Sequence, residues 1–149
     1  MELTIRAVIT ADLTTIHRIE TGIYPDPWPR SIFYLMRGRA PDLFLVADDE
    51  GEVVGYAVGE IEWRNSVSVG HVMNIAVEET HRQHGLAGRL MDELESRFKE
   101  RDADSAYLEV RASNFSAQSL YRKRGYRESG VLPRYYKDED GLVMEKLLA

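Results

Sequence analysis

The sequence contains no cysteine, which excludes disulfide bonds, thiolate zinc sites and a cysteine nucleophile. It also has no basic excess, because 25 acidic residues against 19 lysines and arginines give a formal net charge of −6. Nucleic-acid binders normally present a basic stripe, so we expect no nucleic-acid partner. No segment approaches the roughly 20 apolar residues that cross a bilayer, and the first residues do not follow a signal-peptide pattern. These absences predict a soluble cytoplasmic protein with no membrane partner.

The chain does have enough apolar residues to bury a core. Its 149 residues are 44% hydrophobic, which suits one domain and is too little for two comfortable ones. We find no internal repeat, and the proline cluster "YPDPWP" at 24–29 is too short for an interdomain linker. The sequence therefore predicts a single domain over 1–149, as a monomer or weak homodimer.

The hydrophobic pattern alternates between strand and helix periods along the whole chain. Thr10 is the expected cap of the first helix, and Gly125 is the expected end of the last one. Strands are expected near 3–7, in two runs within 42–63 that are joined by the turn Asp48 to Gly51, near 70–77 and 105–112, and in a final hairpin over 126–148. Helices are expected near 11–20, 29–38, 86–98 and 114–125. The order β-α-α-β-β-β-α-β-α-β-β predicts an α/β (α+β) fold, with a mixed sheet of seven strands and about four helices.

The segment 70–111 reads as a strand, a helix and a second strand. Such a unit makes its two strands parallel, with a right-handed crossover. Ligands of α/β sheets bind outside the carboxyl ends of parallel strands. We therefore expect a ligand beside the start of the helix at 86–98.

The stretch "HRQHGLAGRL" at 81–90 lies at that helix start. The N–H groups at a helix N-terminus and the positive end of its dipole favour phosphate, and Arg82 and Arg89 can add charge. The spacing of Gly85 and Gly88 matches neither a dinucleotide-binding loop nor an ATP-type P-loop. By themselves the glycines fit an ordinary loop equally well.

The segment Arg82-Gln83-His84-Gly85-Leu86-Ala87 resembles the R/Q-x-x-G-x-G/A signature of the GNAT acyltransferase superfamily. "GHVMNIAV", "YLEVRASNFSAQSLYRKRGY" and "YYKDEDGLVMEKLL" are similar to motifs of its protein N-terminal acetyltransferases, of the bacterial ribosomal-protein alanine type and the archaeal type. The resemblance covers nearly the entire chain. It implies the twisted GNAT sheet, acetyl-CoA as acetyl donor, no metal, and a protein or peptide N-terminus as acceptor, with ribosomal proteins as candidate substrates.

The same resemblance implies which residues bind the cofactor. The loop binds the pyrophosphate through backbone N–H groups, the strand around 74–77 pairs with the pantetheine amides and polarises the thioester, and Asn114 meets the pantetheine arm. Without the resemblance, Asn114 is simply a helix cap. The implied cofactor-binding residues are Ile75, Ala76, Val77, Arg82, Gln83, His84, Gly85, Leu86, Ala87, Gly88, Arg89, Asn114, Ser116 and Tyr121.

Acetyl transfer needs a neutral amine, a polarised thioester and a proton for the leaving thiolate. A peptide α-amine is already neutral in roughly one molecule in seven at pH 7, so a modest base suffices. Glu109 and His71 lie in the two strands expected to be parallel, and the resemblance implies that they deprotonate the amine through ordered water. It also implies that Tyr121 is the general acid. From the residues alone, Glu109 would be an exposed strand residue paired with Arg111, His71 a strand histidine with satisfied hydrogen bonds, and Tyr121 a core aromatic packed on the sheet.

The resemblance implies a slot for the substrate's first residues. Tyr135 and Tyr136 match its tyrosine pair, and Tyr24, Pro25, Asp26 and Trp28 match its other wall. The closing motif departs from the family's usual Y-Y-x-D-G-E-D-A, and an ordinary exposed hairpin also fits the two tyrosines. Two rival functions stay open: acetylation of small-molecule amines or lysine side chains, and a non-catalytic acyl-CoA-binding module.

Overall fold

The computed structural model describes residues 2–148, which form seven β-strands and four α-helices. The strands are β1 (Leu3–Ala7), β2 (Phe44–Asp49), β3 (Glu52–Arg64), β4 (Val67–Val77), β5 (Ser105–Arg111), β6 (Arg127–Leu132) and β7 (Gly141–Leu147). The helices are α1 (Leu13–Ile23), α2 (Arg30–Arg39), α3 (Leu86–Glu100) and α4 (Phe115–Lys123). Short 3-10 turns occur at η1 (Thr10–Asp12), η2 (Pro41–Leu43) and η3 (Glu79–His81). The order of strands and helices is the one that the sequence predicts.

The strands form one mixed sheet in the order β1-β2-β3-β4-β5-β7-β6. β4 pairs with β5 in parallel, as expected for the strands on either side of α3, whereas β1 with β2, β2 with β3, and β7 with both β5 and β6 pair antiparallel. The predicted fold class and the mixed seven-stranded sheet are confirmed.

The chain divides into two compact units. Unit 1 comprises Met1–Glu60 and Asn74–Arg97, and unit 2 comprises Ile61–Met73 and Phe98–Ala149. The strands β3 and β4 and the helix α3 each contribute residues to both units. The single domain expected from the sequence stays a prediction, and the two units are described separately below.

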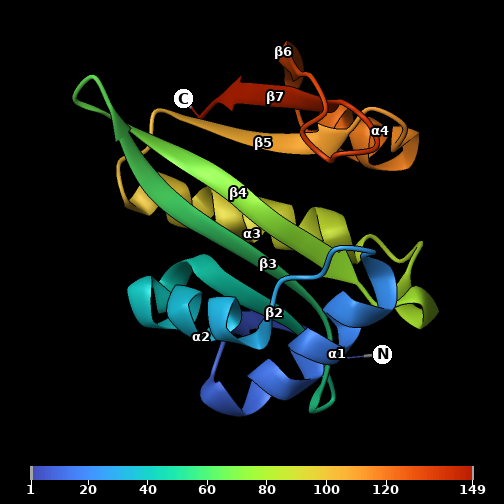
Figure 1. Cartoon of the computed structure of the whole chain (residues 1–149). Coiled ribbons are helices and arrows are strands. Elements are labelled where there is room, and N and C mark those ends of the chain that lie inside the picture. The colour runs from blue at the N-terminus through green and yellow to red at the C-terminus, as the bar shows by residue number, and fades with distance from the viewer. Residues whose placement is uncertain (1, 149) are drawn as a thin grey trace. The chain divides into compact units, whose positions relative to one another are not determined.

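The core of unit 1 is built from the apolar faces of its helices and strands. Leu13 and Ile16 of α1 and Phe33 of α2 are completely buried, as helical spacing of apolar residues requires. The Phe33 ring packs edge-on against Tyr56 of β3, with ring centroids 5.7 Å apart. Figure 1 shows α1 and α2, in blue and teal, close to β2. Burial of one such side chain stabilises the fold by about 1.5–3 kcal/mol.

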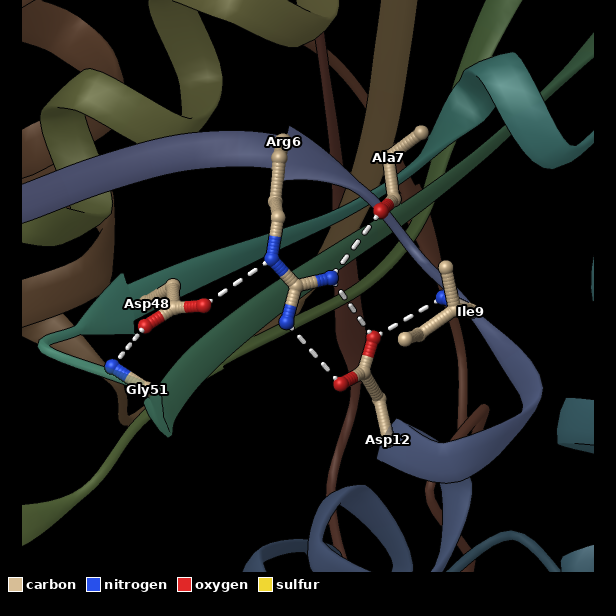
Figure 2. Close-up of polar contacts among 6 residues, drawn as sticks. All are labelled: Arg6, Ala7, Ile9, Asp12, Asp48 and Gly51. Carbon is tan, nitrogen blue, oxygen red and sulfur yellow. Dashed lines mark hydrogen bonds and ion pairs between the residues drawn. The ribbon is translucent and has the colours of Figure 1, made fainter.

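An arginine joins the first strand of unit 1 to two other segments (Figure 2). Arg6 of β1 makes a two-pronged ion pair with Asp12, at 2.9 and 3.0 Å, and donates from Nε to Asp48 of β2 at 3.0 Å. The Asp48 carboxylate also accepts a hydrogen bond from the Gly51 N–H at 2.6 Å, which closes the predicted turn between β2 and β3. Arg6 therefore links β1 to the turn η1 through Asp12 and to β2 through Asp48.

The start of α1 differs from the sequence prediction. Thr10 does not cap the helix, because it lies inside the turn η1, and α1 begins at Leu13. The Asp12 carboxylate, fixed by Arg6, instead accepts the hydrogen bond from the Ile9 N–H at 2.8 Å. A charged acceptor with an arginine partner makes stronger hydrogen bonds than a hydroxyl, which explains why the turn forms around Asp12.

Unit 2 contains β5, β6, β7, α4 and the adjoining ends of β3, β4 and α3. β5 and β7 lie side by side in Figure 1, with Glu109 opposite Val143. The helix α4 begins as predicted, since the Asn114 side chain accepts a hydrogen bond from the Ala117 N–H at 3.1 Å. Gly125 follows its end with a φ of 92°, a conformation that costs glycine little.

Candidate functional site

The predicted phosphate loop of unit 1 reverses the chain just before α3. Gln83 and Gly85 have φ values of 66° and 74°, in the left-handed region that glycine adopts most easily. The Gly85 carbonyl accepts a hydrogen bond from the Arg89 N–H at 3.0 Å and so caps the first turn of α3. The N–H groups that follow Gly85 therefore lie at the positive end of a 15-residue helix, a geometry that suits an anion.

The two arginines of this loop keep their charge. Arg82 donates from Nε to the Val77 carbonyl at 3.2 Å, and Arg89 reaches the Leu3 carbonyl at 3.5 Å. Neutral carbonyls do not neutralise a guanidinium, so both cations can still attract a phosphate.

The histidines of the loop have local contacts. His81 lies 3.0 Å from Asp49 at the end of β2, and the Nδ1 atom of His84 lies 2.9 Å from the Arg82 carbonyl. These contacts hold the loop, His81 through a carboxylate at the end of β2 and His84 through a main-chain carbonyl.

The end of β4 carries the main chain expected to pair with pantetheine. The parallel ladder of β4 with β5 runs from Val69 to Val72, so Ile75, Ala76 and Val77 lie beyond it. The Ile75 carbonyl accepts a hydrogen bond from the Tyr24 hydroxyl at 2.6 Å. Burial and the nearby Glu20 carboxylate raise the pKa of Tyr24 to about 12, so this hydroxyl stays a neutral donor. The predicted substrate residue Tyr24 is thus fixed to the predicted cofactor strand.

Glu20 organises the same part of unit 1, although the sequence analysis assigned it no role. This α1 residue is only 2% exposed. Its carboxylate accepts hydrogen bonds from the Tyr56 hydroxyl at 2.5 Å, the Asn74 amide at 2.8 Å and the Trp28 N–H at 2.9 Å. A glutamate on the apolar face of the helix was the only sequence signal for this site.

The segment between α1 and α2 is held at both ends. Trp28 receives the Glu20 bond at its N–H, and its ring lies 5.3 Å from that of Phe33. The predicted substrate residues Pro25 and Asp26 are exposed in the turn between Tyr24 and Trp28. Pro25 and Asp26 are therefore exposed to solvent, while Trp28 is held in place by Glu20 and Phe33.

In unit 2 the two predicted bases meet. His71 of β4 stands directly opposite Tyr107 of β5, and Glu109, two residues further, shares the face of Tyr107. The Nε2 atom of His71 lies 2.8 Å from Glu109 Oε1. The imidazole also stacks on the Tyr107 ring, with centroids 4.3 Å apart and planes 5° from parallel. The structure thus brings together the carboxylate and the imidazole that the sequence singled out.

A second carboxylate, which sequence reasoning missed, reaches the other side of the imidazole. Glu62 Oε2 of β3 lies 3.0 Å from His71 Nδ1, and the Tyr107 hydroxyl donates to both Glu62 oxygens at 2.8 and 2.7 Å. Arg64 forms an ion pair with Glu62 at 3.2 Å. Charged residues at alternate positions of a strand, Glu62 and Arg64, were the available signal.

These contacts set the charge of Glu62. Burial opposes ionisation, but the Tyr107 hydrogen bond, the imidazole of His71 and the Arg64 guanidinium together lower the pKa of Glu62 below its usual value. Burial and the same carboxylate raise the pKa of the Tyr107 hydroxyl. Glu62 is therefore a carboxylate at neutral pH, and Tyr107 is its neutral donor.

Arg111 does not pair with Glu109, so the alternative that Glu109 serves as its ion-pair partner is wrong. Arg111 instead binds Asp138 at 3.0 Å and Glu139 at 3.1 Å. Its guanidinium also lies over the Tyr136 ring, 4.5 Å from the centroid. These bonds order the segment between β6 and β7.

The predicted tyrosine pair lies in that segment. The rings of Tyr135 and Tyr136 meet edge to face with centroids 4.9 Å apart. Tyr135 is half exposed, and burial together with the negative charge of Glu109 raises the pKa of its hydroxyl. Tyr135 is therefore electrostatically coupled to the predicted base.

Tyr121 and the start of α4 complete the predicted residues of unit 2. Tyr121 is buried and its ring packs against Tyr126 at 6.0 Å, which agrees with the packing role left open by the sequence. Ser116 is exposed in the first turn of α4. The proposed acid role of Tyr121 stays a prediction.

No helix within residues 2–148 combines the length and the apolar character needed to cross a membrane.

The loop of unit 1 suits the phosphates of a nucleotide-bearing acyl donor, and the carboxylate and imidazole pair of unit 2 suits a general base, which are the two needs of an acyltransferase. Residues 13–126 match the acetyltransferase (GNAT) family. The chain belongs to this family, which confirms the resemblance seen in its motifs, and it is an acetyl-CoA dependent acyltransferase.

Individual relatives show which acetyltransferases the chain is similar to. The chain is 37% identical to an N-alpha-acetyltransferase of Sulfolobus acidocaldarius, covering 94% of this chain and 89% of the relative. It is 32% identical to a putative ribosomal protein bS18-alanine N-acetyltransferase of Bacillus subtilis, covering 94% and 92%. The crystal structure of Ard1 from Thermoplasma volcanium superposes with a TM-score of 0.92 at 27% identity, covering 100% and 99%. Other solved structures with this fold are complexes with CoA or acetyl-CoA.

Proposed function

We propose that this protein acetylates the N-terminal α-amine of proteins, taking the acetyl group from acetyl-CoA by direct transfer in a ternary complex. The observation that carries the proposal is the 2.8 Å contact of His71 with Glu109, in a chain whose relatives include N-alpha-acetyltransferases. Following the Bacillus subtilis relative, we include ribosomal proteins among the candidate substrates. We further propose that the protein acts in the cytoplasm, as a monomer or weak homodimer.

In this proposal, unit 1 binds the phosphates of acetyl-CoA. The N–H groups at the start of α3 hold the pyrophosphate, with Arg82 and Arg89 adding charge. The main chain of Ile75, Ala76 and Val77 pairs with pantetheine amides and polarises the thioester oxygen. In unit 2, Asn114 and Ser116 at the start of α4 contact the pantetheine arm.

The reaction itself requires one base and one acid. The α-amine nitrogen attacks the thioester carbonyl carbon while Glu109, supported by His71, accepts a proton from that nitrogen through ordered water. The carbon–sulfur bond then breaks, and the thiolate of CoA takes a proton from the Tyr121 hydroxyl. The products are the acetylated N-terminus and free CoA, without a covalent enzyme intermediate.

Two segments are proposed to contact the substrate peptide. In unit 1 these are Tyr24, Pro25, Asp26 and Trp28, whose exposed tip is fixed by Glu20. In unit 2 the contacts come from Tyr135 and Tyr136, whose edge-to-face rings are ordered by Arg111. An aromatic pair supplies contact area at little cost in side-chain entropy.

The proposal is tested by incubating the protein and acetyl-CoA with a peptide library that varies the first two residues, and reading products by mass spectrometry. We expect a gain of one acetyl group on free N-termini. Matched peptides with blocked N-termini and free lysines serve as the control and should stay unmodified. Acetylation of the lysine peptides alone would refute the choice of substrate. Binding of acetyl-CoA without any turnover would favour a non-catalytic module.

A further inference from the structure

Glu62 is a carboxylate in direct contact with His71 that the proposed reaction does not use. It approaches Nδ1 at 3.0 Å, while Glu109 approaches Nε2 at 2.8 Å. Both glutamates and the histidine belong to unit 2, and each side chain is largely buried. The imidazole is therefore held between two acids rather than beside one.

The number of protons in this arrangement is limited. A neutral imidazole has one N–H, so it can donate to only one of two carboxylates. Both contacts are attractive only when one further proton is present, either on the second ring nitrogen or on Glu109. Without it, Nε2 and Glu109 present lone pairs to each other at 2.8 Å.

The surroundings decide which nitrogen keeps the proton. Glu62 is maintained as a carboxylate by the bifurcated hydrogen bond from the Tyr107 hydroxyl and by Arg64, so it places a permanent negative charge 3.0 Å from Nδ1. Glu109 is coupled to Tyr135, a neutral hydroxyl. The Tyr107 ring stacks flat against the imidazole and limits its rotation. These contacts favour the ring with the proton on Nδ1 and a free lone pair on Nε2.

We propose, on the basis of the function proposed above, that Glu62 is a positioning residue that fixes the Nδ1 proton of His71 and aims the Nε2 lone pair at Glu109. The contact between Nε2 and Glu109 then becomes more favourable when the pair takes up one proton, and this makes the pair a better base. When the amine loses its proton to Glu109, an N–H bond breaks and an O–H bond forms. The proton is then shared with Nε2, and Glu62 balances the resulting imidazolium charge.

The first test reads the ring directly. In protein with ¹⁵N-labelled histidine, we expect the Nδ1–H tautomer to dominate His71 in the unprotonated state. In Glu62→Gln the Nε2–H population should rise at its expense, because the neutral amide no longer holds the Nδ1 proton as strongly. Glu128→Gln, which changes an exposed glutamate of the same unit, is the matched control and should leave the spectrum unchanged.

The second test is kinetic. We expect Glu62→Gln to lower kcat by about tenfold to a hundredfold, the range for a displaced base, with the KM for acetyl-CoA unchanged. Tyr107→Phe keeps the stacked ring but removes both hydrogen bonds to Glu62, so it should change the tautomer and kcat in the same direction by less. If Glu62→Gln folds poorly, Tyr107→Phe tests the same role of Glu62.

The outcomes separate this inference from the function it rests on. An unchanged tautomer and unchanged kcat in folded Glu62→Gln overturn the positioning role. A shifted tautomer in a protein that acetylates no peptide N-terminus supports the action of Glu62 on His71 and refutes the proposed function instead. A shifted tautomer together with a lower kcat supports both.

Discussion

Arg6 in unit 1 and His71 in unit 2 each lie between two carboxylates, and the two arrangements differ in their protons. Arg6 binds Asp12 and Asp48, and His71 binds Glu62 and Glu109. The guanidinium is always protonated and has five N–H donors, so its bonds persist across neutral pH. A neutral imidazole has a single N–H, so it cannot donate to both of its partners. The same charge pattern therefore stabilises the fold with arginine, whereas with histidine we propose that it serves proton transfer.

The largest effect is expected from removing the base. Glu109→Gln should lower kcat by about 10²- to 10⁴-fold, the usual contribution of a general base, because the amide cannot accept the proton. The melting temperature should stay nearly the same, since glutamine fills the same volume. Kinetics with a preferred peptide measure this, and Glu128→Gln at an exposed residue of β6 is the control. Near-normal turnover in Glu109→Gln would mean that another group is the base.

Removing the cation of unit 1 should act on stability instead. Arg6→Met leaves Asp12 largely buried without its partner, and we expect a loss of about 2 kcal/mol in the free energy of unfolding. The figure is below that for a fully buried pair, because the Arg6 side chain is 30% exposed. Urea denaturation measures the loss, and kcat of the folded protein should change less than twofold. A large fall in kcat at unchanged stability would show that the Arg6 network acts in the reaction rather than in folding.

The acid dependence of stability follows from the same network. Burial alone would raise the pKa of Asp12, but Arg6 and the Ile9 N–H outweigh it, so the pKa lies below its usual value. A carboxyl with a lowered folded-state pKa stabilises the fold fully above its unfolded value of about 3.9, and that contribution is lost as pH falls through the folded pKa.

The variant Asp12→Asn isolates this contribution. It should be less stable than the parent at pH 7, and the gap in unfolding free energy should narrow as the pH falls below about 4, where the parent also loses its charge. Urea unfolding from pH 7 to pH 2.5 reads the gap. Parallel curves over that range would show that Asp12 does not carry the acid sensitivity.

The sequence predicts the parts of the fold and site that depend on local pattern. Hydrophobic periods give the order of strands and helices, and the parallel pairing around α3 places His71 and Glu109 on neighbouring strands. The Asn114 cap is a local contact and is confirmed. Thr10 failed as a cap because the competing interaction, from Arg6 to Asp12, joins a strand to the following turn.

The site residues that the sequence did not reveal are all held by long-range contacts. Glu20 and Asn74 are 54 positions apart, and Tyr107 and Glu62 are 45 apart, so no local pattern reveals that they bond. In the sequence, Glu20 only interrupts the apolar face of its helix, and Glu62 resembles an exposed charged residue of a strand. Only the packing of the strands shows that each carboxylate faces several donors.

The smallest effect should come from the hydroxyl of Tyr24 in unit 1, which binds the Ile75 carbonyl at 2.6 Å. Tyr24→Phe removes one hydrogen bond, worth about 1 kcal/mol, and leaves the ring in place. Since Ile75 belongs to the main chain proposed to pair with pantetheine, we expect the KM for acetyl-CoA to rise about threefold to fivefold, with kcat unchanged. Steady-state kinetics at saturating peptide separate the two constants, and Tyr34→Phe, at an exposed tyrosine of α2, is the control. A fall in kcat without a change in KM would place Tyr24 in the chemical step and contradict a binding role for unit 1.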